Sequence, residues 1–328
     1  MIRKIFPMIC VLLAAHLAQA NDSAVETAAG GLRLRNEHSV LMEKEHLTIR
    51  SNGVAVEYEF RNTTDKLVNS EVAFPIPEFE YKFEDSGGPR DFSDFRAWVD
   101  GKPIPVAKEI RAFARGREIT RTLKAAGVTI DRFGYFDPHA GDWRKKYEIL
   151  NLNQQVRDEL VRLGAIEGPP SGKIQSDWEY WPKWKVQLKY HWNQDFSPGK
   201  VVKVRHEYRP VIGYTPVQLD DLMKEHVDSC IDPKSLKVVS NWVAKSLKTD
   251  PLMNGYFGLA WVNYILTTAN TWQTPIKDFN LEVQSSKNEI IAFCWDSPID
   301  RGNPNSIKVK MQNFVPKKDL RIYFLYLN

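Results

Sequence analysis

The sequence predicts a mainly β protein of the α+β class: an antiparallel β-sandwich with a helical insertion, and a C-terminal antiparallel β region carrying one long helix. Apolar and polar residues alternate from 53 to 62 and again from 185 to 208, as half-buried strands require. Apolar residues recur at helical spacing within 107–168 and after Pro233. We expect three parts: a signal peptide at 1–20, the sandwich at 21–215 with its insertion at 107–168, and the C-terminal region at 216–328.

The first twenty residues are typical of a cleavable export signal. Arg3 and Lys4 precede an apolar run from Ile5 to Leu17, and Ala18-Gln19-Ala20 supplies the small residues that a signal peptidase requires. The run is shorter than a membrane span of about 20 residues, and no later stretch is apolar enough to cross a bilayer. We expect a periplasmic or secreted mature chain. A retained anchor helix is the alternative.

Charge and composition limit the classes of partner. Removing Arg3 and Lys4 from the formal charge of +4 leaves +2, which is too small to predict nucleic acid or an anionic membrane as a partner. With 43% hydrophobic and 12% aromatic residues, the chain can bury a large core. We expect a folded protein that binds no nucleic acid, and its oligomeric state stays open.

Two cysteines remain after the signal, because Cys10 leaves with it. A pair such as Cys230 and Cys294 in an oxidising compartment predicts a disulfide. It would close a loop of about 64 residues, for which the chain-entropy model gives roughly 4 kcal/mol. Two separate buried thiols, or a nucleophilic cysteine beside a histidine, are the alternatives.

The first sandwich strand is expected at 53–62, where the apolar face carries Val54, Val56, Tyr58 and Phe60. Residues 47–49 repeat the pattern upstream, and a turn separates the strand from an apolar run at 67–74, so we expect an antiparallel meander. Pro75 and Pro77 should end that run, because proline cannot donate to a sheet ladder.

Two hairpins and two helical segments follow. Asp100-Gly101 favours a tight turn between residues 95–99 and 104–106, and Ser197-Pro198-Gly199 separates the alternating runs of a second hairpin. The helical insertion has two apolar stripes: Ile110, Phe113, Ile119 and Leu123, then Leu152, Val156, Leu160 and Leu163. Asp232-Pro233 is typical of a helix start, and the stripe behind it is Leu236, Val239, Val243 and Leu247.

Several motifs together carry a family resemblance. They are Gly30-Gly31-Leu32, Phe60-Arg61-Asn62-Thr63, Ala73-Phe74-Pro75-Ile76-Pro77, Tyr264-Ile265-Leu266, Phe293-Cys294-Trp295 and Phe314-Val315-Pro316. With them, nearly the whole mature chain resembles the secreted bacterial domain-of-unknown-function family 4424. The resemblance implies an exported bacterial protein and brings no catalytic residues. Residues 45–110 and 185–212 also resemble the sandwich of vault and inter-alpha-trypsin inhibitor domains, which usually serves interaction.

The strongest binding feature in the sequence is a crowd of aromatic residues. Trp178, Tyr180, Trp181 and Trp184 lie together, and flat aromatic faces are surfaces on which sugars, peptides or aromatic partners stack. These four residues are the predicted binding site. The alternative is that they belong to the core, because aromatic side chains supply most core area per residue.

Catalytic features are sparse. Asp137, His139 and Asp142 share one loop and could hold a cation or shuttle a proton, although an ordinary loop has the same composition. His206 falls on an apolar strand face and is expected to be a hydrogen-bonded core histidine. Zinc spacings, phosphate loops and serine nucleophile elbows are absent, so we expect no metal site and no cofactor.

These observations favour a non-enzymatic binding or interaction module of the bacterial envelope, with a protein or glycan partner. An envelope hydrolase that uses the loop Asp and His cluster is one alternative. A structural or assembly protein that pairs through edge strands is another.

Overall fold

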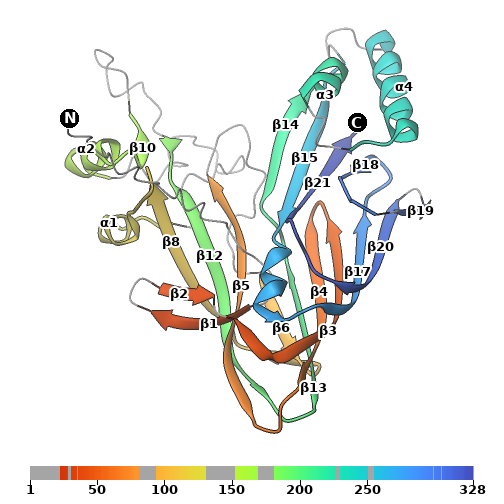
Figure 1. Cartoon of the computed structure of the whole chain (residues 1–328). Coiled ribbons are helices and arrows are strands. Elements are labelled where there is room, and N and C mark those ends of the chain that lie inside the picture. Colours follow the sequence, from red (N-terminus) through yellow and green to blue (C-terminus); the bar gives the residue numbers. More distant parts are fainter. Residues whose placement is uncertain are drawn as a thin grey trace, which may run out of the picture.

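The computed structural model describes residues 23–28, 31–34, 36–80, 94–130, 152–168, 181–225, 230–249, 255–297, 299–303 and 305–327. It confirms the predicted β-rich class, with several mostly antiparallel sheets and few helices (Figure 1). Within these residues no helix is both long enough and apolar enough to cross a membrane.

The largest sheet has nine strands in the order β19-β20-β17-β3-β4-β13-β6-β7, with β16 beside β3. They are β3 (Glu37–Arg50), β4 (Gly53–Asn62), β6 (Arg96–Val99), β7 (Lys102–Ile104), β13 (Val201–Tyr208), β16 (Trp272–Gln273), β17 (Ile276–Gln284), β19 (Asp300–Asn303) and β20 (Ser306–Phe314). On β4 the expected alternation holds, because Val54 to Phe60 bury every second side chain while Glu57 is exposed. β17 runs parallel to β3, so strands from both predicted regions share one sheet.

Two more large sheets complete the β structure. The six-stranded sheet has the order β2 (Gly31–Leu34), β1 (Ser23–Ala28), β5 (Val68–Glu80), β12 (Lys185–Phe196), β8 (Ala107–Ala114), β9 (Arg117–Glu118). The four-stranded sheet has the order β14 (Ile212–Val217), β15 (Phe257–Tyr264), β21 (Leu320–Tyr326), β18 (Glu289–Ala292). β10 (Ile166–Glu167) pairs with β11 (Trp181–Pro182). Since β14 spans residues 215 and 216, the expected boundary falls inside a strand.

Helices pack on two of these sheets. They are α1 (Thr120–Ala125), α2 (Gln154–Arg162), α3 (Leu219–Glu225), α4 (Pro233–Thr249) and the 3₁₀ helix η6 (Thr267–Thr271). α4 starts at Pro233 as predicted, because Asp232 accepts hydrogen bonds from the backbone N–H groups of Lys234 and Ser235, each at 3.0 Å.

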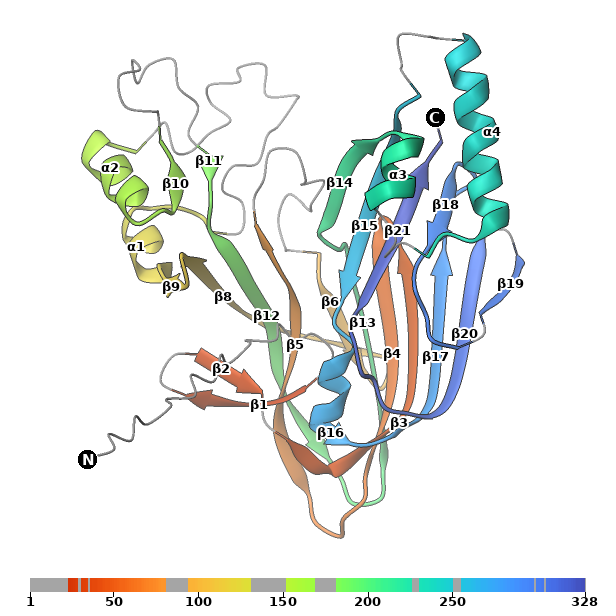
Figure 2. The same cartoon turned by 45° about the horizontal axis from the view of Figure 1, so that its top comes forward.

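Within the described residues, three apolar cores hold the elements together. The main core gathers side chains from the three large sheets, such as Phe60, Phe74 and Phe324. A second core packs α1 and α2 on the six-stranded sheet around Trp184. A third packs α4 on the four-stranded sheet through Val239 and Leu259. The main core and α4 therefore lie on opposite faces of the four-stranded sheet. Figure 2 shows α4 beside this sheet.

The antiparallel step of the expected meander from β3 to β4 is confirmed, but its step from β4 to β5 and the second hairpin are corrected by the sheet topology. β4 pairs with β3 and β13, whereas β5 pairs with β1 and β12 in the other sheet. Likewise, β12 and β13 belong to different sheets, so the turn between them is a crossing of the chain from the six-stranded to the nine-stranded sheet. Both crossings lie at the bottom of Figure 1. Alternation identifies a strand but does not choose its neighbour, which is why these partners were missed. The hairpin of β6 and β7 around Asp100-Gly101 is confirmed.

The prolines of β5 are also a correction, because the strand continues through them to Glu80. β1 pairs with β5 at residues 71–73, and beyond that point β12 is the described neighbour of β5. Among the described residues, Pro75 and Pro77 thus have a neighbouring strand on one side alone, and sheets tolerate proline in such strands.

The start of the expected helical insertion is a strand. Residues 107–114 form β8, which pairs with β12 along residues 185–191. Ala112 and Ala114 are buried with strand periodicity, and the helical spacing of Ile110 and Phe113 was coincidental. The later parts of the segment form α1 and α2, as predicted.

Candidate functional site

A cleft of about 400 Å³ lies where the six-stranded sheet approaches the four-stranded sheet. One wall is the end of β5 and the start of β12: Ile76, Pro77, Glu78, Phe79, Glu80 and Lys185. The opposite wall belongs to β14, β15 and β21: Ile212, Gly213, Trp261, Asn263 and Arg321. Tyr208, Pro210 and Val211 connect the walls at the end of β13. Figure 2 shows the ends of β5 and β12 across from β14 and β15. This volume lies in the lower part of the range of about 300–1,000 Å³ that is typical of small-molecule sites.

The first wall carries two carboxylates and one ammonium group. Lys185 Nζ lies 3.1 Å from Glu78 Oε1 and 3.8 Å from Glu80 Oε1. The other Glu78 oxygen accepts a 3.0 Å hydrogen bond from Gln187 Nε2. The hydrogen bond with Glu78 raises the pKa of Lys185, so the ammonium stays charged at neutral pH. The formal charge of these three side chains is therefore −1.

An irregularity in the sheet places Glu78 there. The register of β12 against β5 shifts between Val186 and Leu188, whose partners are Phe79 and Ile76. Pro77 and Glu78 consequently lie opposite the single residue Gln187. Such a bulge re-aims side chains, and it also tolerates the proline that precedes Glu78.

The second wall combines an aromatic face with one cation. The Trp261 indole lies over Gly213 of the neighbouring strand, since a Cβ at Gly213 would stand 1.9 Å from Trp261 Cε2. Arg321 Nε donates a 2.9 Å hydrogen bond to Asn263 Oδ1. Among the described residues, no carboxylate comes within ion-pair distance of Arg321. The wall therefore presents a half-buried indole and a cation with a formal charge of +1.

Tyr208 lines the junction of the walls, and its hydroxyl group is buried. Its side chain is 6% exposed, and the hydroxyl has no hydrogen-bond partner among the described residues. Burial raises the pKa of Tyr208, so the phenol stays protonated and can donate. Buried polar groups are normally paired, which makes this hydroxyl a feature to explain.

A second hollow of about 630 Å³ lies beside β7 and the end of β12. His191 Nδ1 lies 2.8 Å from Glu71 Oε1 at its edge, and Trp192 and Ile104 contribute to its lining. It brings together one acidic and one imidazole group that already bond to each other. The cleft between the sheets offers the richer chemistry, because it combines both charge signs with an indole.

The predicted aromatic site is only partly within the described residues. The Trp184 side chain is 0% exposed and packs in the second core, so this residue is corrected from surface to core. The backbone of Trp181 belongs to β11. Trp178 and Tyr180 lie outside the described residues, as do Asp137, His139 and Asp142. His206 is fully buried in the main core, as expected. The part of the chain that is described holds no group of three His, Cys, Asp or Glu residues suited to a metal ion.

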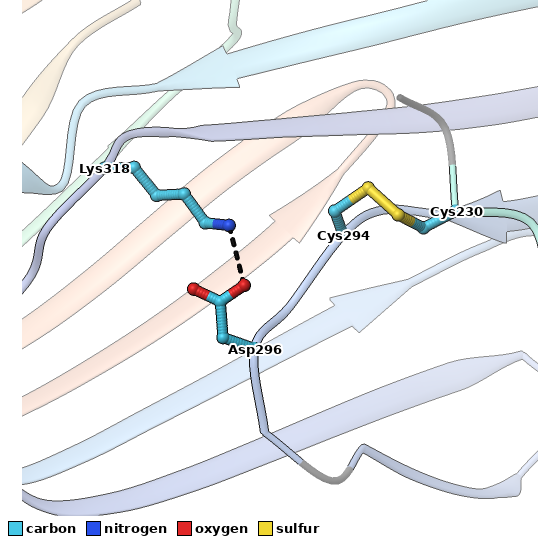
Figure 3. The surroundings of a disulfide bond; sticks show 4 residues. All are labelled: Cys230, Cys294, Asp296 and Lys318. Carbon is cyan, nitrogen blue, oxygen red and sulfur yellow. Dashed lines mark hydrogen bonds and ion pairs between the residues drawn. A yellow bond between two sulfur atoms is a disulfide. The ribbon is translucent and has the colours of Figure 1, made fainter. Parts of the chain in front are cut away.

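The predicted disulfide is present. Cys230 and Cys294 are bonded, with their Cα atoms 5.0 Å apart (Figure 3). The bond ties the segment before α4 to the segment after β18, close to the ion pair of Lys318 with Asp296 at 2.9 Å. It therefore anchors the start of α4 to the four-stranded sheet that the helix covers.

Sequence reasoning did not identify the residues of the cleft. Glu78, Lys185, Trp261 and Arg321 come from four strands spread along the chain, and no local spacing connects them. The only local signal was Gly213 within a β-like run, because glycine in a strand often marks the close approach of another group.

Comparisons with known proteins give a family. No curated protein matches the chain. Among solved structures, a "putative nutrient binding protein" from Legionella pneumophila is 15% identical with a TM-score of 0.44, over 93% of this chain and 70% of that one. An M1 zinc metallopeptidase from Deinococcus radiodurans is 7% identical with a TM-score of 0.24, over 88% of this chain and 43% of that one. The model of the family described as "Domain of unknown function (DUF4424)" matches residues 20–323, and the chain belongs to that family.

Proposed function

We propose that this protein is a non-enzymatic binding module that holds a small polar ligand in the cleft between the six-stranded and four-stranded sheets. One observation carries the proposal: the cleft collects both charge signs and a half-buried indole from strands of two sheets. Ligand sites characteristically combine apolar lining with a few convergent polar groups.

The compartment belongs to the same proposal. The signal-like residues at the N-terminus and the disulfide of Cys230 with Cys294 support a periplasmic or secreted protein. The ligand then comes from the bacterial envelope or its surroundings, and peptides and glycan fragments are the classes to test.

A thermal-shift screen tests the proposal on the chain from Asn21 to Asn328. Amino acids, short peptides, peptidoglycan fragments and oligosaccharides are added singly. A ligand present at 100 times its Kd should stabilise the folded state by about 2.7 kcal/mol. Trp261→Ala should abolish the shift, whereas Trp98→Ala, on β6 of the nine-stranded sheet, should preserve it.

Two outcomes contradict the proposal. One is the absence of a shift with every compound. The other is a shift that survives Trp261→Ala, because the ligand would then bind elsewhere.

A further inference from the structure

We infer that helix α4 docks the protein on an anionic lipid membrane. The contact is made by one face of the helix, the lysine face, which is formed by Lys234, Lys237, Lys245 and Lys248. This surface is separate from the proposed ligand cleft, because none of the described residues that line the cleft belongs to α4.

The lysine face lies on the side of α4 that is turned away from the rest of the protein. Val239 and Val243 are buried on the opposite side, against the four-stranded sheet. At 3.6 residues per turn, the four lysines fall within about 80° of the helix circumference, and the centre of this arc lies about 180° from the two valines. All four lysines are exposed, and they span about 21 Å along the helix axis. α4 itself stands at the outer edge of the molecule (Figure 1 and Figure 2).

The charge of the lysine face is not neutralised by the part of the chain that the structure describes. α4 contains no Asp or Glu, and no described carboxylate lies within ion-pair distance of its lysines. The neighbouring helix α3 carries Asp220 and Asp221, but neither forms an ion pair with α4. The helix therefore presents a formal charge of +4, a local excess that the small net charge of the whole chain does not reveal.

Lysine suits a membrane surface better than it suits one fixed anion. Its ammonium is a compact, hydrated point charge on a flexible stem, and it lacks the planar fork with which arginine binds a single carboxylate or phosphate. Such charges can follow lipid headgroups that move within the bilayer plane. Clusters of four to eight basic residues on a helix are typical of binding to anionic lipids. The proposed export would bring the chain to the headgroups of an envelope membrane.

An apolar border beside the lysine face fits the same partner. The Val238 side chain is 53% exposed, and Trp242 is half-buried one turn farther along the same side. Indole rings are favoured at the level of lipid headgroups, where one part of the ring is apolar and the other is wet. The phosphate backbone of a nucleic acid would match the lysines but would offer no apolar layer to this border.

Vesicle co-sedimentation of the chain from Asn21 to Asn328 tests the inference. The protein should bind vesicles made from an equal mixture of phosphatidylcholine and phosphatidylglycerol, and it should not bind phosphatidylcholine alone. Each lysine near an anionic surface contributes about fivefold to the affinity, so the variant with all four lysines of the face changed to Gln should bind more than about 100-fold more weakly. Raising the salt from about 0.1 M to about 1 M shortens the Debye length from about 10 to about 3 Å and should abolish the binding.

A second quadruple variant is the matched control. Lys102→Gln, Lys124→Gln, Lys200→Gln and Lys317→Gln remove the same total charge from exposed positions that are scattered over the molecule and form no described ion pair. This control should weaken binding less than about fivefold, which is the effect of one lysine of the face. Circular dichroism melting shows whether each variant folds. If the first variant unfolds, Lys237→Gln combined with Lys245→Gln replaces it and should weaken binding about 10- to 30-fold.

Three outcomes overturn the inference. In the first, the wild type binds neither kind of vesicle or binds both equally. In the second, the two quadruple variants lose affinity to the same extent, because net charge alone would then explain the binding. In the third, the wild type binds soluble poly-glutamate through the lysine face but binds no vesicle, which would assign α4 to an acidic protein partner. None of these results bears on the ligand cleft, which the thermal-shift screen tests separately.

Discussion

Asn62 Nδ2 donates a 2.7 Å hydrogen bond to the carbonyl oxygen of Phe196, and this contact joins the two turns that carry the chain between the large sheets. The same nitrogen donates to the Lys66 carbonyl at 2.7 Å, and Oδ1 accepts from the backbone N–H of Thr64 at 2.8 Å. The carboxamide is fully buried. A single side chain therefore fixes both crossings.

Replacing Asn62 should be costly because of these contacts. Asn62→Ala leaves the Phe196 carbonyl buried without its donor, and we expect a loss of about 2–3 kcal/mol in the free energy of unfolding. Asn69→Ala is the control, since Asn69 bonds to Asp195 on the exposed surface and should cost under about 1 kcal/mol. Urea unfolding followed by circular dichroism measures both. Equal losses would contradict the assigned role.

The contact of Gly213 with Trp261 predicts a second effect. Gly213→Ala places a Cβ 1.9 Å from the indole, so Trp261 must move. We expect a loss of about 1–3 kcal/mol from overpacking and a loss of ligand binding in the cleft. Gly53→Ala meets no heavy atom of the described residues within 4 Å and should stay near the wild-type stability. A normal melting temperature for Gly213→Ala would show that the indole lies elsewhere.

The disulfide should contribute substantially to stability. The double variant with Cys230→Ala and Cys294→Ala opens a loop with a sequence separation of 64 residues, for which the chain-entropy model gives about 4 kcal/mol. Guanidinium unfolding should show a lower midpoint for this variant. A reducing agent should lower the wild-type midpoint toward that of the variant and leave the variant itself unchanged. Insensitivity of the wild type to reduction would contradict the bond.

The N-cap of α4 should make stability depend on pH. Partial burial pushes the pKa of Asp232 upward, but hydrogen bonds from Ser235 and Lys234 and the charge of Arg301 at 3.2 Å outweigh it and hold the pKa below its usual value. A carboxyl group with a lowered folded-state pKa stabilises the protein above its unfolded-state pKa of about 3.9, and this contribution is lost as the pH falls through the folded-state pKa.

Asp232→Ala should therefore cost about 1 kcal/mol at pH 7, and the difference from the wild type should shrink below about pH 4. Asp232→Asn keeps a capping oxygen and should cost less at pH 7. Urea unfolding at several pH values between 3 and 7 gives the comparison. A difference that stays constant across this range would mean that the charge of Asp232 contributes nothing.

Local features of the fold were predictable from the sequence, and pairings were not. β4 occupies residues 53–62 as predicted, because one buried and one solvated face impose a period of two. The start of α4 followed from Asp232-Pro233, and the disulfide followed from cysteine number and compartment. The sheet that β5 joins depends on contacts with β12, more than a hundred residues later, and no local pattern encodes that choice.

The cleft escaped prediction for a related reason. Glu78 enters it through a bulge that forms only when β5 meets β12, and Trp261 enters it because Gly213 of another strand leaves room. For Trp184 the local pattern indicated a binding surface, whereas the structure places the side chain in a core. Its aromatic neighbours in the sequence suggested a surface, but the helices of the insertion supply a core that covers it.

The parallel pairing of β3 with β17 has a consequence for biosynthesis. Residues 44 and 278 are register partners, so about 230 residues must be added after one before the other exists. At roughly 5–20 residues per second, the growing chain carries an unpaired β3 edge for roughly 10–50 s. An unpaired edge with an apolar face, such as that of Leu47 and Ile49, is a template for aggregation. We therefore expect the nascent chain to depend on a holding chaperone until β17 (Ile276–Gln284) has been made.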